Sequence, residues 1–103
     1  DRGKRSEMGR QAAELADAVI VTDDNPRHEA PAEIRRQILA GCPDAWDIGA
    51  RREAITAGVA GLSAGDLLVV AGKGHETVQI VGSKSVPFDD AEIARSAVEE
   101  MAP

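Results

Sequence analysis

Cysteine and aromatic residues are scarce in this chain, which has one cysteine, one tryptophan, one phenylalanine and no tyrosine. The single thiol, Cys42, cannot form an internal disulfide, which suits a reducing compartment. We expect Cys42 to fill a small buried space rather than to act as a nucleophile. With Trp46 and Phe88 as the only aromatic residues, the core must be built from valine, isoleucine, leucine and alanine.

Long apolar runs and a dense basic stripe are also missing. No stretch approaches the roughly 18 apolar residues of a membrane-spanning helix, and none resembles a signal peptide. We therefore expect a soluble, cytoplasmic protein with no membrane partner. Twelve Lys and Arg face 18 Asp and Glu, for a net charge of −6. Nucleic-acid binding requires clustered cations that neutralise phosphates, so nucleic acid is not an expected partner.

The length of 103 residues fits one globular domain, which we place over 1–103. The chain begins at Asp1 rather than Met and enters at once the charged, glycine-containing stretch 1–5, with no core element before it. This start predicts an internal fragment of a longer protein.

Four stretches place apolar residues at helical spacing. Ser6 can cap the first of them, and Asp89, followed by Glu92, can cap the last. Pro31 is a favoured first residue for the second helix, and Gly41 is a typical stop for it. The predicted helices span residues 6–16, 31–40, 51–62 and 89–100.

Two short, continuous apolar runs, 18–21 and the stronger 67–71, predict parallel strands covered on both faces. Residues 46–48 are a weaker strand candidate. Two further runs, 78–81 and 86–88, flank a polar turn and predict an antiparallel hairpin. Strands alternating with helices predict an α/β fold, with a Rossmann-like, mainly parallel sheet flanked by helices and the antiparallel hairpin at its C-terminal end.

The loop over 22–27 follows the first predicted strand and reads Thr-Asp-Asp-Asn-Pro-Arg. The guanidinium of Arg27 can bind a carboxylate through two hydrogen bonds, and the side-chain amide of Asn25 can add another. Its carboxylates could accept from an ammonium, so that the loop suits a zwitterionic ligand. The alternative is a polar turn in which Asp24 caps its own backbone.

The loop over 72–76 follows the other strong strand and reads Gly-Lys-Gly-His-Glu. Both loops should open at one edge of the sheet, where the carboxyl ends of parallel strands bind ligands. The second loop lacks the spacing of a P-loop, so a phosphate cradle is not favoured. His75 and Glu76 lack the further ligands of a metal site, and none is predicted. The alternative is a structural turn held by His75, and the role of Lys73 stays open.

Three segments together resemble the Mur ligases: DRGKR at 1–5, TDDNPR at 22–27 and AGKGHE at 71–76, in this order and spacing. The chain is similar to the C-terminal, amino-acid-binding domain of that family along essentially its whole length. The DNPR segment is the most specific part, because it is similar to the branch that adds meso-diaminopimelate and the lysine-adding branch departs at its Arg.

The resemblance implies the following substrate-binding residues and no catalytic residue. Asn25 and Arg27 would hold the distal carboxylate of meso-diaminopimelate. The Gly72 carbonyl and the Glu76 carboxylate would hold its distal ammonium. Asp24 would order the loop or help to bind the ammonium.

The family activates UDP-N-acetylmuramoyl-L-alanyl-D-glutamate as an acyl phosphate with ATP and Mg²⁺, and the diaminopimelate amine then attacks it during synthesis of the peptidoglycan precursor. The resemblance implies that the parts binding ATP, Mg²⁺ and the nucleotide lie in other domains, and that the first strand of the family domain is missing here. The chain alone should therefore be inactive. A lysine-adding Mur ligase, a folylpolyglutamate synthetase-like domain and a free-standing α/β ligand-binding module remain alternatives.

Overall fold

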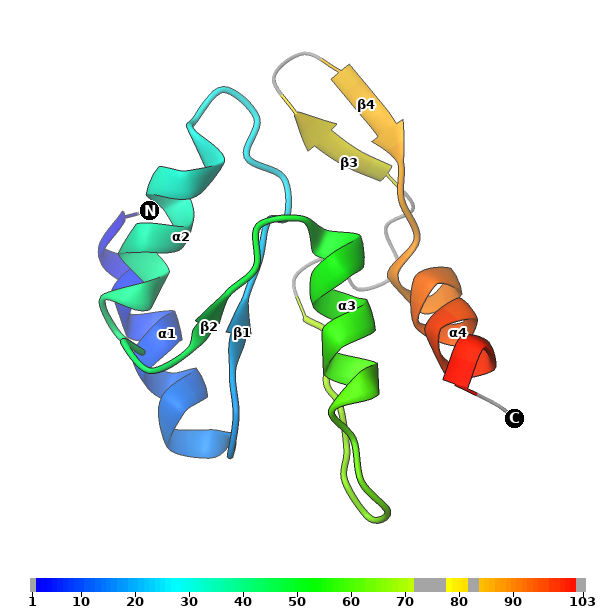
Figure 1. Cartoon of the computed structure of the whole chain (residues 1–103). Coiled ribbons are helices and arrows are strands. Elements are labelled where there is room, and N and C mark those ends of the chain that lie inside the picture. Colours follow the sequence, from blue (N-terminus) through cyan, green and yellow to red (C-terminus); the bar gives the residue numbers. More distant parts are fainter. Residues whose placement is uncertain (1, 72–77, 82–83, 102–103) are drawn as a thin grey trace.

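The structure is a computed structural model that describes residues 2–71, 78–81 and 84–101 (Figure 1). Helices α1 and α2 lie on one side of a short strand pair, and α3 and α4 lie on the other (Figure 1). The described part is therefore an α/β structure, as predicted. In chain order its elements are α1 (Arg2–Leu15), β1 (Ile20–Val21), α2 (Pro31–Leu39), β2 (Trp46–Asp47), α3 (Arg51–Ala60), β3 (Val78–Val81), β4 (Lys84–Pro87) and α4 (Asp90–Met101).

Strands β1 and β2 are parallel, with Ile20 opposite Trp46. The Trp46 amide donates to the Val19 carbonyl at 3.0 Å, and the Ile48 amide donates to the Val21 carbonyl at the same distance. Helix α2 connects the two strands, so the predicted βαβ unit is present. Its helix begins at Pro31 and ends before Gly41, as the sequence indicated.

Helix α1 begins earlier than predicted. Ser6 lies inside the helix, where its Oγ donates to the Gly3 carbonyl at 3.3 Å, so the expected N-cap role of Ser6 is wrong. Arg2, Lys4 and Arg5 have long, unbranched side chains that favour helix and extend it by one turn.

Two glycines allow α1 and α2 to approach closely. A Cβ at Gly9 would lie 2.1 Å from the Ile38 carbonyl oxygen, and one at Gly41 would lie 1.9 Å from the Ser6 carbonyl oxygen. Both distances are shorter than any side chain tolerates. The backbones of the two helices therefore meet directly at these positions.

The prediction of a buried strand at 67–71 is wrong, since these residues form no strand in the structure. Leu67 is 86% exposed and Val69 is 75% exposed. A strand needs a hydrogen-bonding neighbour on at least one edge, and within the described residues none pairs with this segment. Leu67 and Val69 therefore stay in solvent and Leu68 and Val70 are half-buried, although the pattern itself is that of a buried strand.

Helices α3 and α4 pack together and supply most of the buried apolar side chains. Helix α3 begins at Arg51 as predicted and ends two residues earlier, at Ala60. The Asp89 carboxylate accepts from the amides of Ala91 at 3.0 Å and Glu92 at 3.3 Å, which confirms the predicted cap of α4. The buried apolar residues of the two helices are Ala54, Ile55, Val59, Ile93 and Ala97.

Strands β3 and β4 pair antiparallel, with Val78 opposite Pro87 and Val81 opposite Lys84. The turn of the predicted hairpin lies outside the described residues. Over the part of the chain that the structure describes, no helix is both long enough and apolar enough to cross a bilayer.

Candidate functional site

The loop that follows β1 contacts the loop that follows β2. The Thr22 hydroxyl donates to the Gly49 carbonyl at 3.1 Å, and the Asp23 amide donates to the same oxygen at 3.2 Å. The first polar loop is therefore anchored at the carboxyl end of the parallel strand pair. In α/β folds this is the end at which ligands bind.

Arg35 of α2 binds two carboxylates, one in the loop after β1 and one on β2. It donates to Asp23 at 2.5 Å and to Asp47 at 2.7 Å. The hydrogen bond to Asp23 raises the pKa of Arg35, burial opposes that effect, and the bond to Asp47 supports it. Asp23 is thus held within the protein by Arg35.

Asp24, Asn25 and Arg27 lie in the loop between β1 and α2. Asp24 and Asn25 are half-buried, whereas Arg27 is exposed. Pro26 is buried between them, and its carbonyl accepts from the Glu29 amide at 3.0 Å. The backbone of Arg27 has a φ of 56°, in the left-handed region that a non-glycine residue rarely occupies. Such local strain is concentrated at binding and switch sites.

The other half of the predicted site, Gly72 and Glu76, lies outside the described residues, as do Lys73 and His75. The segment that leads into it is described up to Ala71. A hydrogen bond from one buried side chain, Arg51, reaches the Ala71 carbonyl at 3.0 Å. The position of Ala71, the residue before the second polar loop, is therefore described by the structure.

Arg51 is buried in the side of the molecule that carries α3 and α4, with 4% of it exposed. Its Nε and Nη2 donate to the two carboxylate oxygens of Asp90 at 2.8 and 2.6 Å. Its Nη1 donates to the Asp23 carbonyl at 3.0 Å, and Nη2 also reaches Ala71. One guanidinium thus joins α3, α4 and the stems of both polar loops.

Charge and burial act against each other at Arg51. Burial disfavours the charged guanidinium, but the hydrogen bonds to Asp90, its charge and that of Asp24 outweigh burial, so the pKa of Arg51 is raised. Asp90 is itself buried, with 5% exposed.

Sequence reasoning missed the role of Arg51, which it treated only as the first residue of a helix. One signal was present. A cation at a helix N-terminus is unfavourable, because that end of the helix carries a partial positive charge. An arginine there requires a compensating anion, and Asp90 at the start of α4 supplies it.

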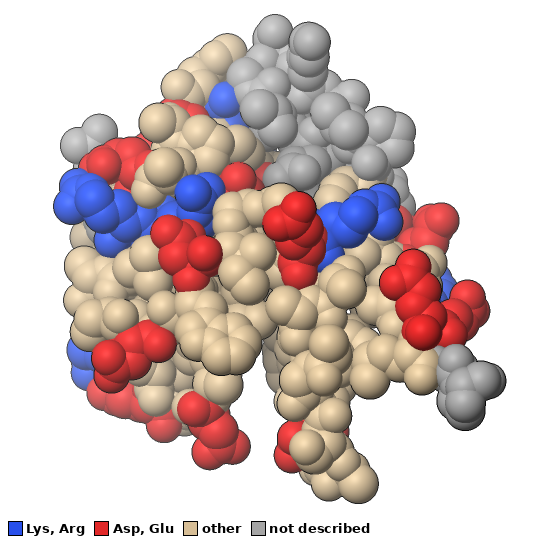
Figure 2. Space-filling view, viewed as in Figure 1, with Lys and Arg blue, Asp and Glu red and all other residues tan. Residues whose placement is uncertain are grey.

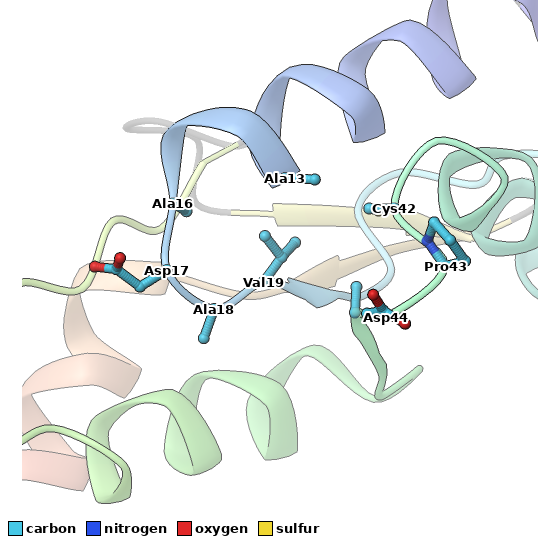
Figure 3. A pocket seen from close by; sticks show the side chains of 9 residues that line it. Ala13, Ala16, Asp17, Ala18, Val19, Cys42, Pro43 and Asp44 are labelled. Atoms are coloured by element: carbon cyan, nitrogen blue, oxygen red, sulfur yellow. The ribbon is translucent and has the colours of Figure 1, made fainter.

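A hollow of about 240 Å³ lies between the end of α1, the start of β1 and the turn after α2 (Figure 3). Its lining is mostly small and apolar, including Ala13, Ala16 and Val19, and it adjoins the amino end of β1. Cys42 is buried there, and its thiol donates to the Ile38 carbonyl at 3.4 Å. The hollow is therefore at the opposite end of the strand from the polar loop.

Charged residues of both signs are interspersed over the face seen in Figure 2, outside its grey region. Within the described ranges, no three His, Cys, Asp or Glu residues are grouped so as to hold a metal ion. The polar loop over 22–27 and the Arg51 contacts beside it remain the candidate site.

Residues 1–74 match the family model of "Mur ligase, glutamate ligase domain". The chain is 58% identical over 100 residues to UDP-N-acetylmuramoyl-L-alanyl-D-glutamate–2,6-diaminopimelate ligase of Chelativorans sp. (strain BNC1), covering 97% of this chain and 21% of that protein. It is 57% identical over 102 residues to the protein of the same name from Mesorhizobium japonicum, covering 99% and 21% respectively.

A solved structure of a UDP-N-acetylmuramoyl-L-alanyl-D-glutamate–2,6-diaminopimelate ligase superposes with a TM-score of 0.91 at 40% identity. The superposition covers 97% of this chain and 21% of that one, so the chain spans about a fifth of the length of these relatives. The family match covers well over half of the chain, including the whole first polar loop. The chain belongs to the Mur ligase family.

Proposed function

We propose that this chain is the amino-acid-recognising C-terminal domain of an ATP-dependent ligase. The ligase adds meso-diaminopimelate to UDP-N-acetylmuramoyl-L-alanyl-D-glutamate in the cytoplasmic synthesis of the peptidoglycan precursor. The observation that carries the proposal is the identity of 58% over 97% of the chain to a diaminopimelate ligase. The loop that contains Asp24, Asn25 and Arg27 lies within that span, and its stem is anchored at the end of β1.

In this proposal the two ends of the distal zwitterion bind to different loops. Asn25 and Arg27 hold the carboxylate, and Arg27 is exposed on a turn that Pro26 fixes. The Gly72 carbonyl and the Glu76 carboxylate hold the ammonium, and Asp24 adds negative charge beside them. Lysine has the ammonium and lacks the carboxylate, so Arg27 is the residue that separates the two amino acids.

The domain contributes positioning rather than bond chemistry. It holds the far end of the amino acid and thereby presents the reacting amine at a high effective concentration. The sequence contains no P-loop. In this proposal, ATP and Mg²⁺ bind to the remainder of the ligase.

We also propose that the sheet becomes Rossmann-like within the ligase. Strand β1 pairs with β2 on one edge, and no described strand covers the other. Segment 67–71 has the composition of a buried strand and lies exposed. A parallel strand from elsewhere in the ligase, placed between them, would pair with β1 and 67–71 and bury Leu67 and Val69.

Calorimetry of the complete ligase tests the function directly. Meso-diaminopimelate should bind with measurable heat at a concentration at which L-lysine shows none. The LL-stereoisomer of diaminopimelate is the matched control for geometry at equal charge. Equal affinity for lysine and meso-diaminopimelate would refute the substrate assignment and favour the lysine-adding branch.

A further inference from the structure

We infer that Arg51 is a positioning residue for amino-acid recognition, which it serves by fixing the first polar loop, 22–27, against α3, α4 and the backbone of Ala71. The inference rests on the proposed function, because it takes the loop over 22–27 to bind the amino acid. It concerns a residue that lies outside that loop.

The geometry gives Arg51 two separable tasks. Its contacts with Asp90 join α3 to α4 through two hydrogen bonds of 2.8 and 2.6 Å. Its contacts with the carbonyls of Asp23 and Ala71, both at 3.0 Å, join the stems of the loops that begin at 22 and 72. The first task holds the fold together, and the second holds the site together.

The two carbonyls belong to residues directly beside the proposed ligand-binding groups. Asp23 lies two positions before Asn25, and Ala71 immediately precedes Gly72. A displacement at the Asp23 stem therefore moves the proposed carboxylate-binding groups, Asn25 and Arg27, relative to the rest of the domain.

Only arginine can perform both tasks at once. The guanidinium is planar and presents five donors in a rigid fork, so that one side binds the carboxylate and the other reaches both carbonyls. Lysine keeps the positive charge beside Asp90, but its three donors radiate from a single atom. We therefore expect Arg51→Lys to keep the ion pair and to lose one or both carbonyl contacts.

The test is steady-state kinetics of the complete ligase with Arg51→Lys. KM for meso-diaminopimelate should rise about tenfold, as expected for the loss of about one hydrogen bond to the site. KM for ATP, KM for the nucleotide substrate and kcat at saturating diaminopimelate should not change. Arg52→Lys is the matched control, because Arg52 is the next residue and is exposed. It should leave every constant unchanged.

Arg51→Met combined with Asp90→Leu provides a second variant, should Arg51→Lys fail to fold. This pair replaces a buried ion pair by apolar side chains of similar size, which proteins commonly tolerate. It also removes both carbonyl contacts, and it should raise the same KM. An unchanged KM for diaminopimelate in a folded variant, with only a lower melting temperature, would reduce Arg51 to a structural residue and overturn the inference.

Arg27→Ala separates this inference from the proposed function. If Arg27→Ala leaves KM for diaminopimelate unchanged, the proposed site itself is wrong. If Arg27→Ala raises KM and Arg51→Lys does not, only the positioning role fails. If positioning is correct, Arg51→Lys should have a smaller effect in the Arg27→Ala background than in the wild type, because the two residues then act on one contact.

Discussion

Arg5 and Glu29 lie 24 positions apart in the sequence and are joined by two parallel hydrogen bonds. Nη1 donates to Oε2 at 2.9 Å, and Nη2 donates to Oε1 at 2.8 Å. The hydrogen bond to Glu29 raises the pKa of Arg5, burial opposes that effect, and the Glu29 charge supports it. Arg5 also donates to Gln37 at 2.8 Å, so α1 is tied to α2 and to the segment that carries the first polar loop.

Glu29→Gln should loosen this segment by less than about 1 kcal/mol, the range of exposed ion pairs. The bound is low because Glu29 keeps 47% of its side chain in solvent. Amide hydrogen exchange in the first turn of α2, measured in the complete ligase, should become faster, and added salt should reduce the difference. Glu14→Gln removes a more exposed partner of Arg10 and should leave the exchange of α2 unchanged.

Arg27→Ala should raise KM for meso-diaminopimelate roughly ten- to a hundredfold, since hydrogen bonds to charged groups contribute about 1.5–3 kcal/mol. KM for ATP should barely move. Activity with lysine should stay small, because Asn25 and Glu76 would still lack a fully matching ligand. Arg36→Ala is the control, since Arg36 lies on the exposed face of α2 and pairs with Glu33. A wild-type KM in Arg27→Ala would return Arg27 to the role of a turn residue.

Gly9→Ala should destabilise the protein, although alanine favours helix over glycine by about 1 kcal/mol. The new Cβ would meet the Ile38 carbonyl at 2.1 Å and would force α1 away from α2, an overpacking that typically costs about 1–3 kcal/mol. Gly61→Ala is the matched control, because its Cβ would meet nothing closer than 3.5 Å. Thermal unfolding should show a lower melting temperature for Gly9→Ala and an unchanged one for Gly61→Ala.

Cys42 should react slowly with thiol reagents in the native protein. Burial raises the pKa of its thiol. Less thiolate is therefore present near pH 8.5, which is about the ordinary pKa of a cysteine thiol. The native state keeps the proton where the unfolded state has lost it. The corresponding stability is therefore complete below the ordinary pKa and is lost as pH rises through the raised one.

Mass spectrometry of the peptide that contains Cys42 would follow its modification as a function of pH. The same peptide in denaturant is the control, and it should react faster at each pH. Equal rates in the native and unfolded protein would show that the thiol is accessible, contrary to its buried position.

Sequence patterns predicted those elements whose signals are local. Pro31 and Gly41 mark the ends of α2, and Asp89 caps α4 through its own side chain, so these features depend on nearby residues alone. The segment 67–71 shows the opposite case. Its composition is that of a strand, but a strand also requires a neighbour, and composition contains no information about whether one is present.

The residues of the candidate site also differ in whether local sequence reveals them. Asp24, Asn25 and Arg27 were predicted together because they are close in the sequence, and they lie in the one loop between β1 and α2. The binding roles of these residues, and of Gly72 and Glu76, stay predictions. Arg51 could not be found from spacing, because its partners lie 20 to 39 positions away.

These separations also bear on the order in which the domain folds. The contacts of Arg51 with Asp23, Ala71 and Asp90 close segments of 28, 20 and 39 residues. Closing a segment costs entropy before its contacts are made, whereas α3 itself forms from neighbouring residues. We expect the helices to form first and the two polar loops to be joined late. In a newly synthesised chain, the helices would then be folded before the proposed amino-acid site is assembled.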